Sequence, residues 1–323
     1  MWMRSCFLHR LVASSVKISE AAGGVIKDIL CDGDLKIIDK GGSGKTADLQ
    51  TEADRAAQYC IVKSLHAVFG DKITIIGEEE TTSFTPRIEK GFCSKVLSLN
   101  DKCPENLRDI NPEDVVIWVD PLDGTVEIAN AAKKSAAVLA QVTVLIGIAY
   151  RGRPIAGVIH QPYYEGRENG RTVWAINGVG TYGMDYVKED NKEQKIVVTT
   201  RSHGTSSVDA ALDALNKKGL ADTVVRVGGA GYKVMRILEG AAAYVFASQG
   251  CKKWDTAACE AVIEGTGGRL TDISGRLLNY EKGVQLNNTG GVLVTACWVD
   301  HQDYLNSIPD ALKEALPEFQ AKN

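Results

Sequence analysis

Apolar residues recur at helical spacing near the start of the chain and in short β-branched runs through the rest of it. Along residues 11–29 the apolar positions fall on one helix face, which predicts a single amphipathic first helix. Residues 51–69 predict a second helix, with Thr51 as its N-cap and with Glu52 and Asp54 in its first turn.

Short apolar runs predict strands, and amphipathic segments between them predict helices. The strands are expected at 72–77, 115–119, 142–150, 155–160, 172–176, 195–200, 223–228, 242–247, 269–273 and 291–297. The later helices are expected at 208–218, 231–240, 255–265 and 301–316. Residues 81–114 are polar and weakly periodic, which is typical of an insertion or lid. Because no proline- or serine-rich linker interrupts this alternation, one compact layered α/β unit over residues 1–323 is expected.

Charge and cysteine usage exclude several kinds of partner. The net charge is −4, so no basic surface predicts a nucleic acid polymer as a partner. No apolar run approaches the ~20 residues of a membrane span, so no membrane partner is expected. The eight cysteines show no C-x-x-C pair and no histidine at zinc spacing, and most lie in apolar segments. Reduced thiols in a cytoplasmic protein are therefore expected.

Two glycine-rich runs imitate phosphate-binding motifs. The run Gly41–Lys45 resembles a P-loop, but that motif needs glycine at position 39, where this chain has aspartate. A glycine hairpin is therefore preferred to an ATP site. The run Gly178–Gly183 matches G-x-G-x-x-G, but the polar segment after it has no apolar helix face. A β-hairpin turn is expected there instead.

Acidic residues gather at predicted strand ends and helix starts. The segment WVDPLDGT (118–125) carries Asp120 and Asp123 on a turn that Pro121 and Gly124 fix, so both carboxylates can face one point. Three more carboxylates hold similar positions, and they are Asp54, Glu78 and Asp255. Each alone is more simply a helix cap or a solvated turn residue, but five together predict a cluster. Grouped carboxylates repel unless cations neutralise them, and oxygen-only ligands favour Mg²⁺ or Mn²⁺ over zinc.

Three segments in combination resemble the signature motifs of the lithium-sensitive, magnesium-dependent phosphatase superfamily. They are IIGEE (75–79), WVDPLDGT (118–125) and WDTAACEAVIEGTGG (254–268). The resemblance extends from the first helix to about residue 297. It implies an inositol monophosphatase-like αβαβα fold with mixed sheets, with most metal ligands in residues 1–195 and the nucleotide-binding segments in 196–323. It also implies two or three Mg²⁺ ions, Mn²⁺ as a substitute and Li⁺ as an inhibitor.

The resemblance assigns roles to individual residues. The implied metal ligands are Glu78, Asp120, Asp123, Asp255 and the carbonyl of Leu122. Asp54 would organise the attacking water with Thr125 as its partner. The implied substrate-binding residues are Gly124, Thr200, His203, Gly229 and Lys233.

Five segments are most similar to the bisphosphate nucleotidases within that superfamily. They are DLQTEADRAAQ (48–58), TVLIGIAY (143–150), TTRSH (199–203), RVGGAGYK (226–233) and YVFASQGCKKWDTAA (244–258). The implied reaction removes the 3′-phosphate of adenosine 3′,5′-bisphosphate to give AMP, with the sulfated nucleotide as a second substrate. Hydrolysis of inositol phosphates is the alternative. Residues 126–141 depart from the family pattern as an alanine-rich insertion, and a monomer or weak homodimer is expected.

Overall fold

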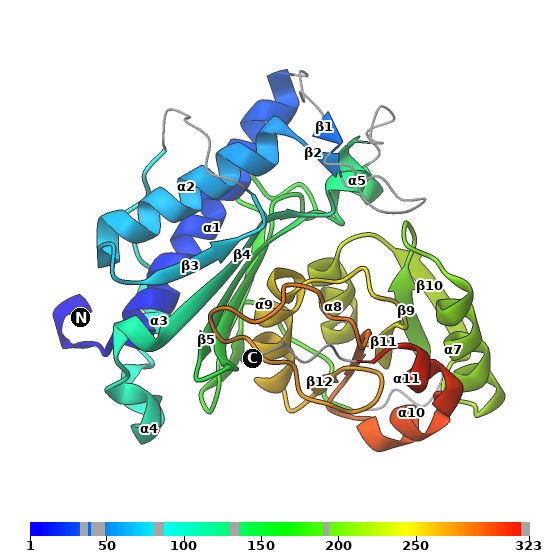
Figure 1. Cartoon of the computed structure of the whole chain (residues 1–323). Helices are drawn as coiled ribbons and strands as arrows, with labels where there is room; N and C mark the ends of the chain where they lie inside the picture. Colours follow the sequence, from blue (N-terminus) through cyan, green and yellow to red (C-terminus); the bar gives the residue numbers. More distant parts are fainter. Residues whose placement is uncertain (33–37, 40–48, 80–86, 130–135, 190–193, 318–323) are drawn as a thin grey trace.

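The computed structural model describes residues 1–32, 38–39, 49–79, 87–129, 136–189 and 194–317. Helices and strands stack in five alternating layers (Figure 1). This arrangement confirms the predicted layered αβαβα fold with mixed sheets.

The first sheet has six strands among the described residues, in the order β3-β4-β5-β6-β7-β8. Only β3 and β4 run parallel, and each later pair is antiparallel. The strands are β3 (Thr74–Gly77), β4 (Val115–Asp123), β5 (Thr143–Tyr150), β6 (Arg153–Gln161), β7 (Arg171–Ile176) and β8 (Gly180–Tyr182). Helix α1 (Phe7–Asp32) packs on β5, β6 and β7, and α2 (Glu52–Phe69) packs on α1 and β4. Both helices lie on the outer face of this sheet (Figure 1).

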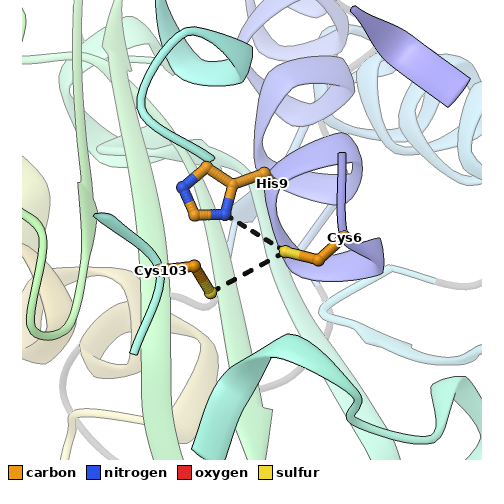
Figure 2. A group of neighbouring side chains, drawn as sticks. All are labelled: Cys6, His9 and Cys103. Carbon is orange, nitrogen blue, oxygen red and sulfur yellow. Dashed lines mark hydrogen bonds between the residues drawn. The ribbon is translucent and has the colours of Figure 1, made fainter. Parts of the chain in front are cut away.

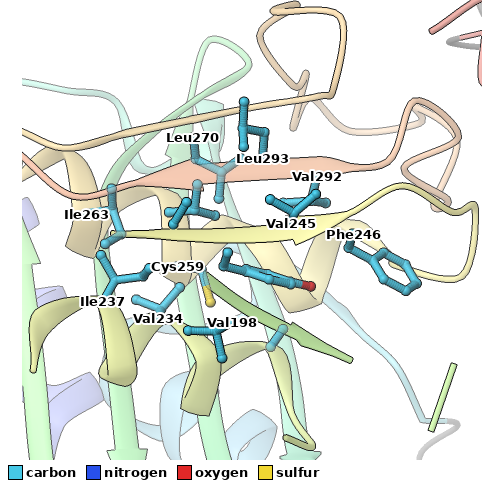
Figure 3. Packing of buried hydrophobic residues seen from close by; sticks show 14 of the residues in the cluster. Val198, Val234, Ile237, Val245, Phe246, Cys259, Ile263, Leu270, Val292 and Leu293 are labelled. Atoms are coloured by element: carbon cyan, nitrogen blue, oxygen red, sulfur yellow. The ribbon is translucent and has the colours of Figure 1, made fainter. Parts of the chain in front are cut away.

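The second sheet has the strand order β10-β9-β11-β13-β12 within the described ranges. Its strands are β9 (Ile196–Thr200), β10 (Thr223–Val227), β11 (Ala243–Phe246), β12 (Arg269–Thr271) and β13 (Val292–Thr295). Helices α8 (Ala230–Leu238) and α9 (Lys253–Glu264) lie between the sheets and contact both. Helices α7 (Ser206–Lys217) and α10 (His301–Ser307) form the last layer, on β11 and β13. Figure 3 shows Val234 and Cys259 of the middle helices packed beneath Val245 and Leu293 of this sheet.

The remaining elements are short. They are α3 (Ser94–Leu97), α4 (Glu105–Arg108), α5 (Thr125–Ala129), α6 (Ala136–Leu139), α11 (Asp310–Ala315), the pair β1 (Ile38–Asp39) and β2 (Leu49–Gln50), and 3-10 turns at Trp2–Arg4, Asn100–Lys102 and Pro112–Asp114. No described helix is both long enough and apolar enough to cross a membrane.

Several sequence predictions need correction. The final helix is two helices, α10 and α11, because Pro309 precedes the second and cannot continue the first. An insertion or lid was expected at 81–114, and the described part of it, residues 87–114, does not form a lid over the site. This part buries Val96, Leu97 and Leu107 in the core beneath α1 and lines none of the site cavity. Strand β8 was not predicted.

The glycine-rich segments have different outcomes. The G-x-G-x-x-G segment forms the antiparallel β7–β8 hairpin, as predicted, and Gly178 at its turn has φ +80°. The predicted hairpin at Gly41–Lys45 lies outside the described residues. The alanine-rich insertion contains α5 and α6, and residues 130–135 between them also lie outside the described ranges.

Candidate active site

The end of β4 delivers both aspartates of the WVDPLDGT segment. The strand extends through Asp123 rather than stopping at Val119, and its register against β5 shifts between Asp120 and Asp123. Pro121 lies within this shift, where a missing N–H does not interrupt a regular ladder. Gly124 then adopts φ +98°, a value that favours glycine, and α5 begins at once.

A cavity of about 370 Å³ opens beside this strand end. It gathers residues from β4, β9, β11, from the N-termini of α5, α8 and α9, and from the position just after β3. The predicted site residues that line it are Glu78, Asp120, Leu122, Asp123, Gly124, Thr125, Thr200, His203, Gly229, Lys233 and Asp255. Asp54 is the one predicted site residue outside the lining, and it contacts Thr125 from behind. The structure therefore brings the predicted residues together, while their individual roles stay predictions.

Asp54 is anchored at the start of α2. Its Oδ2 accepts hydrogen bonds from the Thr51 backbone N–H, at 2.9 Å, and from the Thr51 hydroxyl. Its Oδ1 lies 2.7 Å from the Thr125 hydroxyl, which also lies 3.0 Å from the Leu122 carbonyl. Burial raises the pKa of Asp54, and the hydrogen bonds from Thr51 and Thr125 partly oppose that rise. The arrangement fixes one buried carboxylate behind one hydroxyl that faces the cavity.

The carboxylates of the cavity raise one another's proton affinity. Burial raises the pKa of Asp120 well above its ordinary value, and the charges of Glu78, Asp123 and Asp255 raise it further. Although part of Asp255 is open to the cavity, burial raises its pKa to about 6, with Asp123 as the next cause. Such a concentration of negative charge fits a site for hard divalent cations.

Asp120 and Asp123 both line the cavity, and the charge of Asp123 acts on Asp120. Among the described side chains, no three of the cavity carboxylates place oxygens within 4.8 Å of one another. Asp123 instead accepts hydrogen bonds from the N–H groups of Ala230 (2.8 Å) and Gly231 (2.7 Å) at the start of α8. The partial positive charge of a helix N-terminus attracts a carboxylate, so Asp123 joins β4 to α8.

Two residues that position the contact between β4 and α8 were not predicted from the sequence. The Thr143 hydroxyl donates to Asp123 at 2.7 Å, and Gln141 accepts from the Gly228 N–H at 2.8 Å. Both residues precede or begin β5, where they resemble ordinary strand-start residues. Gly229 has φ +64°, and a Cβ there would lie 2.8 Å from Asp123 Oδ2. The glycine thus permits the close approach of α8 to β4.

Lys233 supplies a buried positive charge to the same cavity. Its Nζ donates to the Gly229 carbonyl at 2.8 Å and lies 5.4 Å from the centre of the Tyr244 ring. Burial lowers the pKa of Lys233, while the nearby carboxylate of Asp123 opposes this effect. The cation is therefore held by the backbone at the start of α8 and by an aromatic face.

The cavity lining also contains aromatic and hydrogen-bonding groups. Tyr244, Phe246 and Trp254 line the cavity and are largely buried, and none of them was among the predicted site residues. The alternation of Tyr244 and Phe246 along β11 is a signal that both face one side. At the rim, the His203 backbone N–H donates to the Thr200 hydroxyl at 3.1 Å.

Two glycines set the position of Asp255. Gly147 of β5 and Gly157 of β6 are paired across the sheet, and α9 packs directly on them. A Cβ at Gly147 would lie 2.5 Å from Ala257 Cβ, and one at Gly157 would lie 2.5 Å from the Ala258 carbonyl. The Asp255 carboxylate also accepts from the Lys252 N–H at 2.8 Å, which caps α9. Close helix packing therefore brings the first turn of α9 to the strand ends.

Comparison with known proteins agrees with this geometry. Residues 8–312 match the model of the inositol monophosphatase family. The chain is 44% identical to the human 3′(2′),5′-bisphosphate nucleotidase 1, covering 96% of this chain and 97% of that protein.

Solved structures show the same fold. The chain is similar to CysQ from Bacteroides thetaiotaomicron, a bacterial member of the family, with a TM-score of 0.64, 23% identity, and coverage of 91% of this chain and 99% of that one. It is also similar to an IMPase/NADP phosphatase complexed with Mg²⁺ and phosphate, with a TM-score of 0.59, 17% identity, and coverage of 88% and 89%. On its motifs, its layered fold and these matches, the chain belongs to the inositol monophosphatase family.

Proposed function

We propose that this protein is a Mg²⁺-dependent phosphomonoesterase that removes the 3′-phosphate of adenosine 3′,5′-bisphosphate, giving AMP and phosphate. The observation that carries this proposal is one cavity whose lining combines carboxylates with Lys233 and aromatic side chains. A nucleotide with two phosphates offers phosphate oxygens to metal ions and to a lysine, and a base to aromatic rings. The high identity to a bisphosphate nucleotidase over nearly the whole chain supports the same substrate. The nucleotide whose 5′-phosphate carries sulfate is the second substrate.

Oxygen ligands around the cavity fit Mg²⁺. The residues that would hold two or three ions are Glu78, Asp120, Asp123, Asp255 and, through its carbonyl, Leu122. When bound, these ions would polarise a phosphate oxygen and lower the pKa of a water molecule. Mn²⁺ would substitute, and Li⁺ would inhibit.

The pair of Thr125 and Asp54 would orient the attacking water and hold its proton. The Thr125 hydroxyl can donate to Asp54 while its oxygen accepts from a water in the cavity. As that water loses a proton to Thr125, the threonine proton passes to Asp54. Burial raises the pKa of Asp54, so this carboxylate accepts a proton more readily than an exposed one.

The remaining residues would select the nucleotide. The buried ammonium of Lys233 would neutralise charge on a phosphate. Tyr244, Phe246 and Trp254 offer flat apolar surface against which a base can pack. Thr200, His203 and Gly229 would bind the sugar and phosphates at the rim, and Gly124 would lie near the scissile phosphate.

Initial rates on a substrate panel test the proposal. With Mg²⁺ present, adenosine 3′,5′-bisphosphate should be turned over faster than inositol 1,4-bisphosphate and inositol 1-phosphate. Removal of Mg²⁺ or addition of Li⁺ should suppress the rate. Preference for an inositol phosphate would favour the alternative function within the same family. We infer a cytoplasmic location, in keeping with the free thiols of all eight cysteines. We also infer a monomer or weak homodimer.

A further inference from the structure

A second group of metal-ligating side chains lies far from the cavity. Cys6 precedes α1, His9 lies in its first turn, and Cys103 follows the 3-10 turn at Asn100–Lys102 (Figure 2). This region adjoins the N-terminal end of β4, whereas the cavity adjoins its C-terminal end (Figure 1). None of the three residues takes part in the proposed phosphatase reaction.

The two separations measured from Cys6 Sγ match those of a tetrahedral zinc site. Cys6 Sγ lies 3.7 Å from Cys103 Sγ and 3.3 Å from His9 Nδ1, and all three atoms lie within 4.8 Å of one another. With Zn–S bonds of about 2.3 Å and Zn–N bonds of about 2.0 Å, tetrahedral angles separate two sulfurs by about 3.8 Å and sulfur from nitrogen by about 3.5 Å. The two separations from Cys6 Sγ differ from these by only a few tenths of an ångström, and Cys103 Sγ lies within 4.8 Å of His9 Nδ1.

Backbone contacts hold the two segments of this group together. The Cys6 N–H donates to Asn100 Oδ1 at 2.8 Å, and the Cys103 N–H donates to the Asn100 carbonyl at 3.0 Å. One asparagine therefore fixes both cysteines, although they are 97 positions apart. Such preorganisation lowers the cost of assembling a ligand set.

The surroundings suit a soft cation that enters from one side. His9 and Cys103 are buried, and Cys6 is half-buried, which leaves a path to the thiols. Among the described residues, His9 Nε2 makes no well-formed hydrogen bond. Burial lowers the pKa of His9, and the nearby backbone of Leu99 partly opposes this effect. Metal-bound histidines commonly donate the N–H of their second ring nitrogen to a backbone carbonyl, and the Leu99 backbone is near enough to serve in this way.

We propose that Cys6, His9 and Cys103 form a binding site for a zinc ion, with solvent as the fourth ligand. Binding would release two protons to solvent, one from each thiol, as two Zn–S bonds form. The ion would join the start of α1 to the segment before β4. The short Cys6-x-x-His9 spacing was missed in the sequence, where no histidine at zinc spacing was recognised, and Cys103 lies far from both in the chain.

Metal content of the full-length protein tests this site independently of phosphatase activity. The protein should be stripped with a chelator, given one equivalent of Zn²⁺ in excess Mg²⁺, and dialysed before zinc is counted. About one zinc per chain should remain, and Co²⁺ in its place should give thiolate charge-transfer absorption. Cys6→Ser, Cys103→Ser and His9→Gln should weaken zinc binding roughly tenfold or more. The exposed Cys31→Ser should retain it.

Two further measurements test where the zinc is bound. The first distinguishes this site from the acidic cavity, and the second asks whether Cys6 and Cys103 form a disulfide instead. Asp120→Asn should keep its zinc, and loss of zinc from that variant would overturn the proposal by placing the ion in the acidic cavity. A Cys6–Cys103 disulfide in the purified protein, found by mass spectrometry, would also overturn it. So would zinc content unchanged by Cys6→Ser. If Cys103→Ser does not fold, the half-buried Cys6 still provides the decisive variant.

Discussion

The Thr125 hydroxyl lies 2.7 Å from Asp54 Oδ1, although 71 positions separate the two residues in the chain. Each stands at a helix start, Asp54 in the first turn of α2 and Thr125 as the first residue of α5. Thr51 fixes the other oxygen of Asp54 through two hydrogen bonds. The pair therefore has one orientation before any substrate arrives.

Replacement of Asp54 should abolish proton uptake without unfolding the site. We expect Asp54→Asn and Thr125→Ala to lower kcat about a hundredfold to ten-thousandfold, because each removes one member of a general-base pair. KM should change much less. Thr125→Ser keeps the hydroxyl and should recover most of the rate. A Thr125→Ala enzyme with normal kcat would contradict a role for this pair.

Asp255 should contribute directly to Mg²⁺ affinity. Asp255→Asn removes one negative charge from the cavity and should raise the Mg²⁺ dissociation constant roughly tenfold or more, measured by calorimetry. The same change should lower the raised pKa of Asp120, since Asp255 is one of its causes. Asp303→Asn, on the exposed surface of α10, is the matched control and should bind Mg²⁺ normally.

The two glycines beneath α9 should tolerate no methyl group. Gly147→Ala or Gly157→Ala would force the helix outward and should cost about 1–3 kcal/mol of unfolding free energy, measured by urea denaturation. Mg²⁺ affinity should fall as well, because Asp255 moves with α9. Gly204→Ala is the control, since a Cβ there meets nothing closer than 3.8 Å. Equal stability of the Gly147 and Gly204 variants would refute the packing argument.

Buried His160 should make the protein sensitive to acid. Its Nδ1 lies 2.9 Å from Thr172 Oγ1, and burial lowers its pKa from 6.5 to about 3. Between pH 6.5 and about 3, His160 is protonated in the unfolded chain but not in the folded chain. The contribution of His160 to the free energy of unfolding therefore falls as the pH falls. The slope from this group is at most about 1.4 kcal/mol per pH unit.

Urea unfolding at a series of pH values between 7 and about 4 measures this slope. His160→Gln should flatten it, because glutamine has no proton to gain in this range. His66→Gln, on the half-buried surface of α2, provides the comparison and should retain the slope. An identical pH profile for the two variants would argue against His160 as the sensitive group.

Local pattern predicted most elements but could not reveal contacts between distant segments. The capping box of Thr51 and Asp54 and the first helix follow from residues close in sequence. The role of residues 87–114 depends on packing against α1. Because the segment is mostly polar, its sequence did not indicate that a few apolar residues are buried in the core. Likewise, the hydrogen bonds of Thr143 with Asp123 and of Gln141 with Gly228 exist only because α8 packs against the end of β4 in the folded chain. The carboxylate cluster was predictable because strand ends and helix starts share one sheet edge.

The place of α9 links the stability of the two sheets to metal occupancy. Its body packs on β4, β5 and β6 on one side and on β12 on the other, while its first turn carries Asp255. Three other acidic residues of the cavity, Glu78, Asp120 and Asp123, belong to or directly follow strands of the first sheet. A cation shared between these groups would resist separation of the layers. Mg²⁺ should therefore raise the melting temperature of the whole chain as one cooperative unit, rather than that of either half.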